Sequence, residues 1–127
     1  MNRIVNPSPL ARYEIAAAGT IEYGMLVALN ADGKAVPAAD AAGLTVIGAA
    51  QEIVENEVEV VSGIFGFANS GTNPVVRSDR GKACYVAGAA TVDSVGGTNK
   101  VPAGIVVDVC DGEVYVDVTP AAIAAAK

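Results

Sequence analysis

The residues of this sequence that could do chemistry are mainly carboxylates, because the chain has no histidine and only 2 cysteines. Asp108 and Asp117 fall on one face of a predicted hairpin, and paired carboxylates can divide general acid and general base work. No supporting polar pattern accompanies them, and strand surfaces often carry acids. Without histidine, the Ser-His-Asp and Cys-His types of nucleophilic catalysis are excluded. We therefore expect a protein that is not an enzyme.

The two cysteines, Cys84 and Cys110, do not predict a metal site. They form no CxxC motif, and the chain has no histidine to complete a zinc site. Free thiols are favoured over a disulfide in a reducing compartment, although the spacing leaves pairing open. We expect neither a metal nor another cofactor.

Charge and hydropathy narrow the range of partners. The net charge is -6 and the sequence pI is about 4.4, whereas a phosphate backbone requires a surplus of Lys and Arg. Every apolar stretch is broken well before the roughly 20 residues that a membrane helix needs. Prolines and charges also interrupt any signal-peptide core near the start. We expect a soluble protein made in the cytoplasm, with neither nucleic acid nor a membrane as partner.

The first twelve residues, "MNRIVNPSPLAR", predict an extended N-terminal arm over residues 1–12, because they contain two prolines and no hydrophobic period. The arm carries no acid, and all 14 acidic residues follow it. One interpretation is a disordered terminus. The other is an arm that becomes ordered on a partner. Its apolar and charged contacts would then be Arg3, Ile4, Val5, Pro7, Leu10 and Arg12.

Short β signals separated by turn residues fill the rest of the chain. They predict an all-β protein, with a single small β-barrel or β-sandwich of short antiparallel strands over residues 13–119. The candidate strands are 13–17, 24–30, 34–37, 44–51, 57–61, 63–68, 83–87, 104–110 and 113–118. A hairpin corner is expected at 30–33. Thr119 as N-cap and Pro120 at the first position predict a short C-terminal helix over 120–127, which needs support from its own barrel or from a neighbour.

The hairpin "IVVDVCDGEVYVDV" is the clearest local prediction, because Asp111-Gly112 tolerates the positive φ angles of a type I′ turn. Simple alternation assigns one set of residues to the core: Ile105, Val107, Val109, Val114, Val116 and Val118. It assigns the other set to solvent: Val106, Asp108, Cys110, Glu113, Tyr115 and Asp117.

Three further patterns each have two interpretations. In "ENEVEVV" (55–61) the glutamates share one side, either as a solvated strand face or as an acidic surface that meets a basic neighbour. Phe65 and Phe67 share a strand face, for core packing or for a subunit contact. "RSDRGK" (77–82) gathers Arg77, Arg80 and Lys82, either as a charged turn or as a salt-bridge site for an acidic partner.

Three segments carry a resemblance to a known family: "GTIEYGMLVALNADGKAVPAADAAGLTVIGAAQE" (19–52), "GIFGFANSGTNPVVRSDRGKACYV" (63–86) and "AGIVVDVCDGEVYVDV" (103–118). In the order, spacing and general character of these three segments, the chain resembles the small head decoration, or capsid cement, proteins of tailed bacteriophages. The match covers most of residues 19–118 and is one of overall pattern, since its motifs are turns and strands.

The resemblance implies a β-barrel or sandwich domain that binds the outer surface of an assembled phage head and stabilises it against internal pressure. It implies the major capsid protein as partner and a homotrimer as the oligomer, on the outer surface of the virion head. The arm would reach the capsid or a neighbouring subunit. Phe65, Phe67, Arg77, Arg80 and Lys82 are candidates for subunit contacts.

A capsid-displayed module that binds a host surface glycan is the alternative function. Glycan sites usually present exposed aromatic rings, and Tyr115 lies on the predicted solvent face of its hairpin. This alternative and the paired-carboxylate enzyme differ from the cement protein in needing a built site on the surface.

Overall fold

The structure, a computed structural model, describes residues 11–127. These residues form ten strands, one 3-10 turn and one helix. The strands are β1 (Ala11–Glu14), β2 (Leu26–Leu29), β3 (Ala35–Pro37), β4 (Thr45–Val54), β5 (Glu57–Val61), β6 (Gly63–Asn69), β7 (Ala83–Gly88), β8 (Thr91–Asp93), β9 (Pro102–Cys110) and β10 (Glu113–Val118). The turn is η1 (Arg77–Asp79) and the helix is α1 (Pro120–Ala126).

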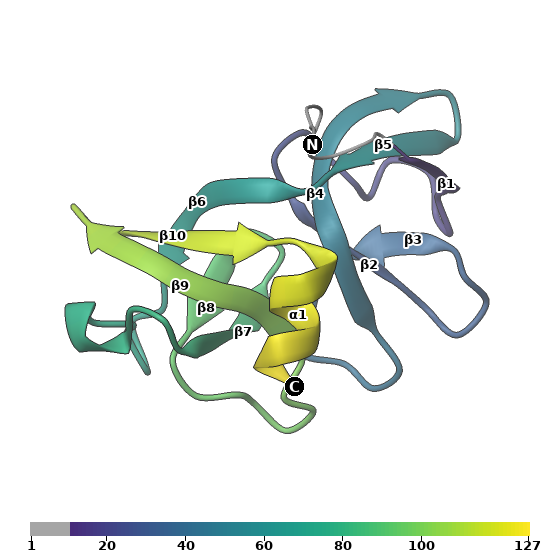
Figure 1. The fold of residues 1–127 in the computed structure, drawn as a ribbon. Helices are drawn as coiled ribbons and strands as arrows, with labels where there is room; N and C mark the ends of the chain where they lie inside the picture. Colours follow the sequence, from purple (N-terminus) through teal and green to yellow (C-terminus); the bar gives the residue numbers. More distant parts are fainter. Residues whose placement is uncertain (1–10) are drawn as a thin grey trace.

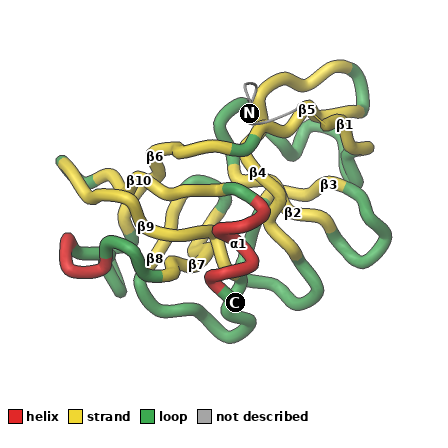
Figure 2. Tube along the Cα trace, in the orientation of Figure 1, coloured by secondary structure: helices red, strands yellow, loops and turns green. Residues whose placement is uncertain are grey.

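The strands form two sheets that lie side by side (Figures 1 and 2). The first has the order β1-β5-β4-β2-β3, and the second is a closed barrel in which β10, β6, β8, β7 and β9 follow one another. Four of the five barrel pairings are antiparallel, and β6 pairs with β8 in parallel. The all-β fold with a small barrel and a short C-terminal helix is therefore confirmed.

The two sheets have the same connectivity. Starting from β6, the barrel has the order β6-β10-β9-β7-β8, which repeats the order β1-β5-β4-β2-β3 strand for strand. In the first sheet Ile15 forms a parallel bridge with Ala35 of β3, at the place where β6 pairs with β8 in the barrel. We call residues 11–61 the first unit and residues 63–118 the second unit.

Backbone hydrogen bonds outside the strands repeat between the two units. Gly24 N donates to Ala50 O at 2.9 Å, and Gly81 N donates to Val106 O at 2.8 Å. Ala16 N donates to Ala35 O at 2.9 Å, and Ser70 N donates to Val92 O at 3.0 Å. Because these bonds occupy equivalent positions in the two units, the chain contains the same five-stranded arrangement twice.

A glycine at the same place in each unit explains why the long strands β4 and β9 can bend. Gly48 pairs with Val27, Gly104 pairs with Cys84, and their φ angles are 154° and 155°. A Cβ at Gly48 would lie 2.6 Å from the carbonyl oxygen of Val61, and one at Gly104 would meet the carbonyl oxygen of Asp117. Only glycine allows this approach of two backbones.

The apolar cores explain how the units are joined. One cluster covers one face of the first sheet: Ile15, Ile21, Val27, Ala35, Ala50, Val58 and Val60. On its other face, Leu26, Ala28 and Val46 belong to the same cluster as the barrel core, which includes Cys84, Val106, Val114 and Val116. The first unit therefore has a core of its own and shares a second one with the barrel.

The hairpin of β9 and β10 confirms the predicted turn and corrects one part of the predicted faces. Asp111 and Gly112 have φ angles of 53° and 80°, as a type I′ turn requires. Val106 is only 2% exposed and Val107 is 42% exposed, the reverse of the expectation. A β-bulge is the reason, because the register passes from Tyr115–Asp108 to Val116–Val106 and leaves Val107 unpaired. Ile105 consequently pairs with Asp117 on the outer side.

Several predicted strand bounds need correction, and β4 runs to Val54, three residues beyond its predicted end. The predicted arm ends too late, because β1 begins at Ala11 and includes Arg12. The strand predicted over 13–17 ends at Glu14, and β8, a strand of only three residues, was not predicted. The hairpin corner at 30–33 is confirmed, with Asn30 Oδ1 accepting from Asp32 N and Lys34 N.

Helix α1 has the predicted start and the support that it needs. Thr119 Oγ1 accepts from Ala122 N at 3.2 Å, and Pro120 opens the helix. Ala122, Ile123 and Ala126 are buried, and the helix packs on β9 and also reaches β4 of the first unit (Figure 1). No helix among residues 11–127 is long and apolar enough to cross a membrane.

Candidate functional site

A group of charged side chains lies on the outward side of β1, β5 and β4. The ladder aligns Arg12, Glu59 and Glu52 in one row and Glu14, Glu57 and Val54 in the next. We call Arg12, Glu14, Glu52, Glu57 and Glu59 the acidic face. Val58 and Val60, on the other side of β5, are 0% and 4% exposed, so the predicted alternation is confirmed over 57–61. Glu55, predicted on the same face as Glu57 and Glu59, lies instead in the turn before β5.

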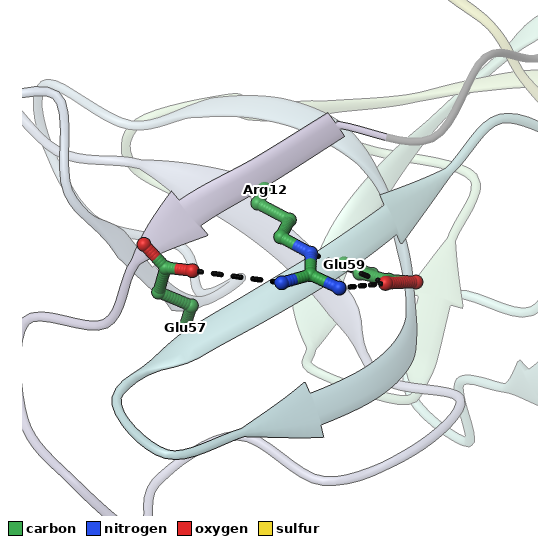
Figure 3. Close-up of polar contacts among 3 residues, drawn as sticks. All are labelled: Arg12, Glu57 and Glu59. Carbon is green, nitrogen blue, oxygen red and sulfur yellow. Dashed lines mark hydrogen bonds and ion pairs between the residues drawn. The ribbon is translucent and has the colours of Figure 1, made fainter.

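Arg12 is the centre of this face (Figure 3). Its Nη2 lies 2.8 Å from Glu59 Oε1 and its Nη1 lies 4.0 Å from Glu57 Oε1. The hydrogen bond to Glu59, followed by the charge of that carboxylate, raises the pKa of the Arg12 guanidinium. Arg12, expected to contact the capsid or a neighbour, thus binds glutamates of its own chain. Arg3, Ile4, Val5, Pro7 and Leu10 lie outside the described residues.

A hollow of about 400 Å³ opens beside the turn that joins β4 to β5. Its lining residues are Arg12, Glu14, Val54, Glu55, Asn56 and Glu57. Lys34 Nζ lies 3.5 Å from Glu14 Oε2, so Glu14, like Glu57 with Arg12, already has a cationic partner. The hollow can accept a cationic or polar group.

Phe65 and Phe67 pack within the protein. Phe67 is 4% exposed, Phe65 is half-buried against the same core, and their ring centroids lie 6.5 Å apart at 61°. Edge-to-face contact of this kind stabilises a core. The core-packing interpretation of this pair is therefore confirmed.

The basic cluster forms a charged turn on the second unit. Asp79 Oδ2 accepts from Val76 N at 2.9 Å, which closes η1. Arg80 Nη1 lies 3.9 Å from Asp108 Oδ1, and Arg77 Nε donates to Val109 O at 3.4 Å. Lys82 is exposed. The two arginines tie the turn to β9, and all three cations remain on the surface.

The two aspartates considered as a catalytic pair have different surroundings. Asp108 Oδ1 accepts from Val109 N at 2.8 Å in addition to its contact with Arg80. Asp117 Oδ1 is buried and has no hydrogen-bond partner among the described residues. The structure therefore gives them separate roles on the hairpin.

Sequence reasoning missed a second buried carboxylate, Asp93. It is 9% exposed, and its Oδ1 has no partner among residues 11–127. Burial, followed by the charge of Asp40, raises the pKa of Asp93. Asp40 itself is held by the loop 96–100, because Thr98 N and Asn99 N donate to its two oxygens at 3.0 and 2.9 Å. The sequence signal was an acid in a short β-type segment, "TVD", whose last residue is Asp93.

Both cysteines are free thiols, with very different surroundings. Burial raises the pKa of Cys84 to about 12, with a smaller effect from the charge of Asp93. Cys110 is exposed, and the charge of Asp111 raises its pKa. The described residues contain no group of three or more His, Cys, Asp or Glu side chains that could hold a metal ion.

Tyr115 is 36% exposed, on the side of its hairpin that was expected to face solvent. Its hydroxyl donates to Glu113 Oε1 at 3.2 Å, and this bond raises its pKa. A Cβ at Gly66 would lie 3.1 Å from the tyrosine ring, so the ring covers the glycine of the neighbouring strand. Tyr23, in the loop before β2, is 75% exposed.

The chain was also compared with known proteins. No protein-family model, curated protein or solved structure matches it.

Proposed function

We propose that this protein is a capsid decoration, or cement, protein that binds the outer surface of an assembled phage head and stabilises it against internal pressure. Its partners in this role are the major capsid protein and further copies of itself, as a homotrimer on the outer head surface of the virion. The proposal rests on the resemblance carried by residues 19–52, 63–86 and 103–118.

The observation that carries the proposal is that charged side chains join segments of the protein to one another. Arg12 joins β1 to β5, Lys34 joins the β2–β3 turn to β1, and Arg80 joins η1 to β9. Each of these ion pairs crosslinks two segments of a small β body that also shares a core between its units. A subunit that reinforces a shell needs such a body, and many copies in an array hold even where each contact is weak.

The test is co-sedimentation of the purified chain with undecorated, expanded heads. The full chain is expected to saturate at a fixed ratio to the shell subunit and to raise the temperature at which the heads open. Failure of the full chain to sediment with heads would overturn the proposal.

The contribution of the arm requires a truncation that keeps β1. Because Ala11 and Arg12 belong to the sheet, the informative variant lacks residues 1–10 only. It is expected to bind heads more weakly while keeping the unfolding midpoint of the full chain. Glu22→Gln, a change of one exposed loop acid, is a matched control with full binding.

A glycan-binding module displayed on the capsid is the second candidate, favoured by the exposed rings of Tyr23 and Tyr115. Aromatic faces stack on sugar rings because the C–H groups on one face of a sugar form an apolar patch that fits against the ring. A glycan array would give a signal that Tyr23→Ala or Tyr115→Ala removes. If the array shows no binding above background, only the cement proposal remains.

A further inference from the structure

We propose that the outer face of the barrel strands β6, β10 and β9 binds the shell protein, through a segment that carries apolar side chains around one lysine or arginine. We call Ile64, Ile105, Val107, Tyr115 and Asp117 the barrel face. This inference rests on the proposed function, because it assigns the surface that meets the head. It can nevertheless fail while the proposed function stands.

The register of the ladder brings the members of the barrel face together. Asp117 of β10 pairs with Ile64 of β6 on one side and with Ile105 of β9 on the other. Tyr115 lies two residues before Asp117 on the same strand and therefore points to the same side. Because neighbouring strands are about 4.8 Å apart, these side chains form one patch and not a set of scattered exposed residues.

The apolar members of the barrel face are open to solvent. Ile64 is 60% exposed, Val107 is 42% exposed and Tyr115 is 36% exposed. Val107 is exposed because the β-bulge leaves it unpaired. In Figure 1 the turn end of the β9–β10 hairpin extends away from the first unit, so the first unit does not cover it. Adjacent exposed apolar side chains of this kind mark an interaction surface.

One member of the barrel face is an acid that lacks a partner. Asp117 Oδ1 is buried and has no hydrogen-bond partner among residues 11–127. The side chains of Ile64 and Ile105, on either side of it, have no donor to offer. A carboxylate oxygen that has lost water without gaining a partner costs free energy. An ammonium or guanidinium group of another molecule would supply the missing donor, while the apolar side chains around it exclude water.

The charge of the chain favours a different protein over a second copy as the occupant. The net charge is -6, so a second copy brings mostly acid to a contact. Arg12, Lys34 and Arg80 also lie beside carboxylates of their own chain. A neutral sugar would stack on Tyr115 but offers no cation to Asp117. The shell protein, with a basic and partly apolar segment, is therefore the partner that fits the barrel face.

The test is co-sedimentation with undecorated, expanded heads, in which the full chain is compared with Ile64→Ser and Asp117→Asn. Serine removes an apolar contact, whereas asparagine keeps the shape of the side chain and removes its charge. Each variant is expected to weaken binding at least about tenfold, the usual effect of losing a central contact. Val95→Ser is the matched control, because Val95 is 53% exposed in the loop before β9, outside the barrel face. It is expected to change binding by less than about twofold.

Salt separates the charge of Asp117 from a structural role. Binding of the full chain is expected to weaken as the salt concentration rises, because salt screens the ion pair. Asp117→Asn is expected to lose part of this dependence, and Ile64→Ser to keep it. Thermal melting by circular dichroism should give both variants a midpoint close to that of the full chain, since neither side chain belongs to an apolar core.

Equal binding of Ile64→Ser and the full chain to heads would overturn this inference and leave the proposed function in place. An Asp117→Asn variant with unchanged affinity or unchanged salt dependence would also overturn it. A full chain that does not sediment with heads would overturn both proposals. If Ile64→Ser instead abolishes association of the free chain with itself in sedimentation equilibrium, the barrel face binds a second copy, which contradicts the inference as well.

Discussion

The two units of this chain have the same strand order and differ at the seam where the sheet meets itself. In the second unit β6 and β8 are joined by backbone bonds at Ala68 and Ser70. In the first unit one parallel bridge, Ile15–Ala35, with its backbone bond from Ala16, and the Glu14–Lys34 ion pair do this work. Closure of a small barrel therefore depends on a few residues at the seam, while the order of the strands is fixed by the rest of the ladder.

The two units also differ in the side chain that lies at this seam. Asn69 lies at the seam of the second unit, where the first unit has Ile15. Its amide donates to Val75 O and accepts from Val75 N, both at 2.8 Å, which holds the following loop against β6. Ile15 fills the core and makes no such link. At this position the first unit thus has an apolar core contact but lacks a hydrogen-bonded link across its loop.

The largest expected effect tests the glycine that both units share in their long strands, β4 and β9. Gly48→Ala and Gly104→Ala are each expected to lower the free energy of unfolding by roughly 3 kcal/mol or more, because the backbone is strained for alanine and the new Cβ meets a carbonyl oxygen. Urea unfolding followed by circular dichroism measures the loss. Gly71→Ala, where a Cβ meets nothing within 4 Å, is the control. A stable Gly48→Ala would show that the first unit can bend without its glycine.

Equivalent valines test whether the units unfold together. Val58 and Val114 are both 0% exposed, so truncation to alanine is expected to cost about 2 kcal/mol in each case. Because Leu26, Ala28 and Val46 of the first unit share a core with the barrel, both variants should shift a single transition. Urea curves by circular dichroism and by tyrosine fluorescence should coincide. Two separated transitions in Val58→Ala would contradict the shared core.

A smaller effect is expected where the second unit carries a buried acid. In the ladder Asp93 is the counterpart of Val36, since it pairs with Tyr85 as Val36 pairs with Ala28. Asp93→Val is expected to raise the free energy of unfolding by about 1 kcal/mol near pH 7, because it removes a buried oxygen without a partner.

The pH dependence of this gain identifies its cause. The folded protein raises the pKa of Asp93, so the folded state binds this proton more tightly than the unfolded chain. The charged carboxylate therefore costs stability above the folded-state pKa, and the cost disappears as the pH falls toward the ordinary value of 3.8. Melting temperatures of wild type and Asp93→Val should converge in acid. A constant difference at all pH values would point to packing as the cause.

The smallest effect is expected from single substitutions in the two hairpin turns. Glu55 and Asp111 occupy the same place in the two units, with φ angles of 57° and 53°. Asp and Asn tolerate this conformation better than Glu. Glu55→Asn is therefore expected to stabilise the protein by about 0.5 kcal/mol, and Asp111→Glu to destabilise it by a similar amount. Chemical denaturation of both variants measures the two changes in the free energy of unfolding. Changes of the same sign would contradict this explanation.

Features that depend on a few neighbouring residues could be predicted from the sequence. Asp111-Gly112, the corner at 30–33 and the Thr119 cap each combine residue types that fix a local conformation. The bulge at Val107 could not, because simple alternation assumes that no residue is left unpaired. β8 has only three residues, too few to show an alternating pattern, although its partner β7 directly precedes it.

The acidic face and the repetition of the unit could be recognised only once the pairing of the strands was known. The side chains of Arg12 and Glu59 meet although they are 47 positions apart, so composition could indicate both charges but not their contact. The repetition did leave a signal in the sequence. Gly48 and Gly104 are followed at the same spacing by "EVEV" and "EVYV", which begin at Glu57 and Glu113.

The different burial of the two cysteines determines how the protein reacts with alkylating reagents. Such reagents attack the thiolate, so Cys84, fully buried and with a pKa of about 12, is protected in the folded barrel. Cys110 is exposed at the end of β9 and can be modified in the native protein. After Cys110 has been blocked, the rate of a second alkylation reports how often the barrel opens. A fluorophore on Cys110 would likewise mark one known site on each chain.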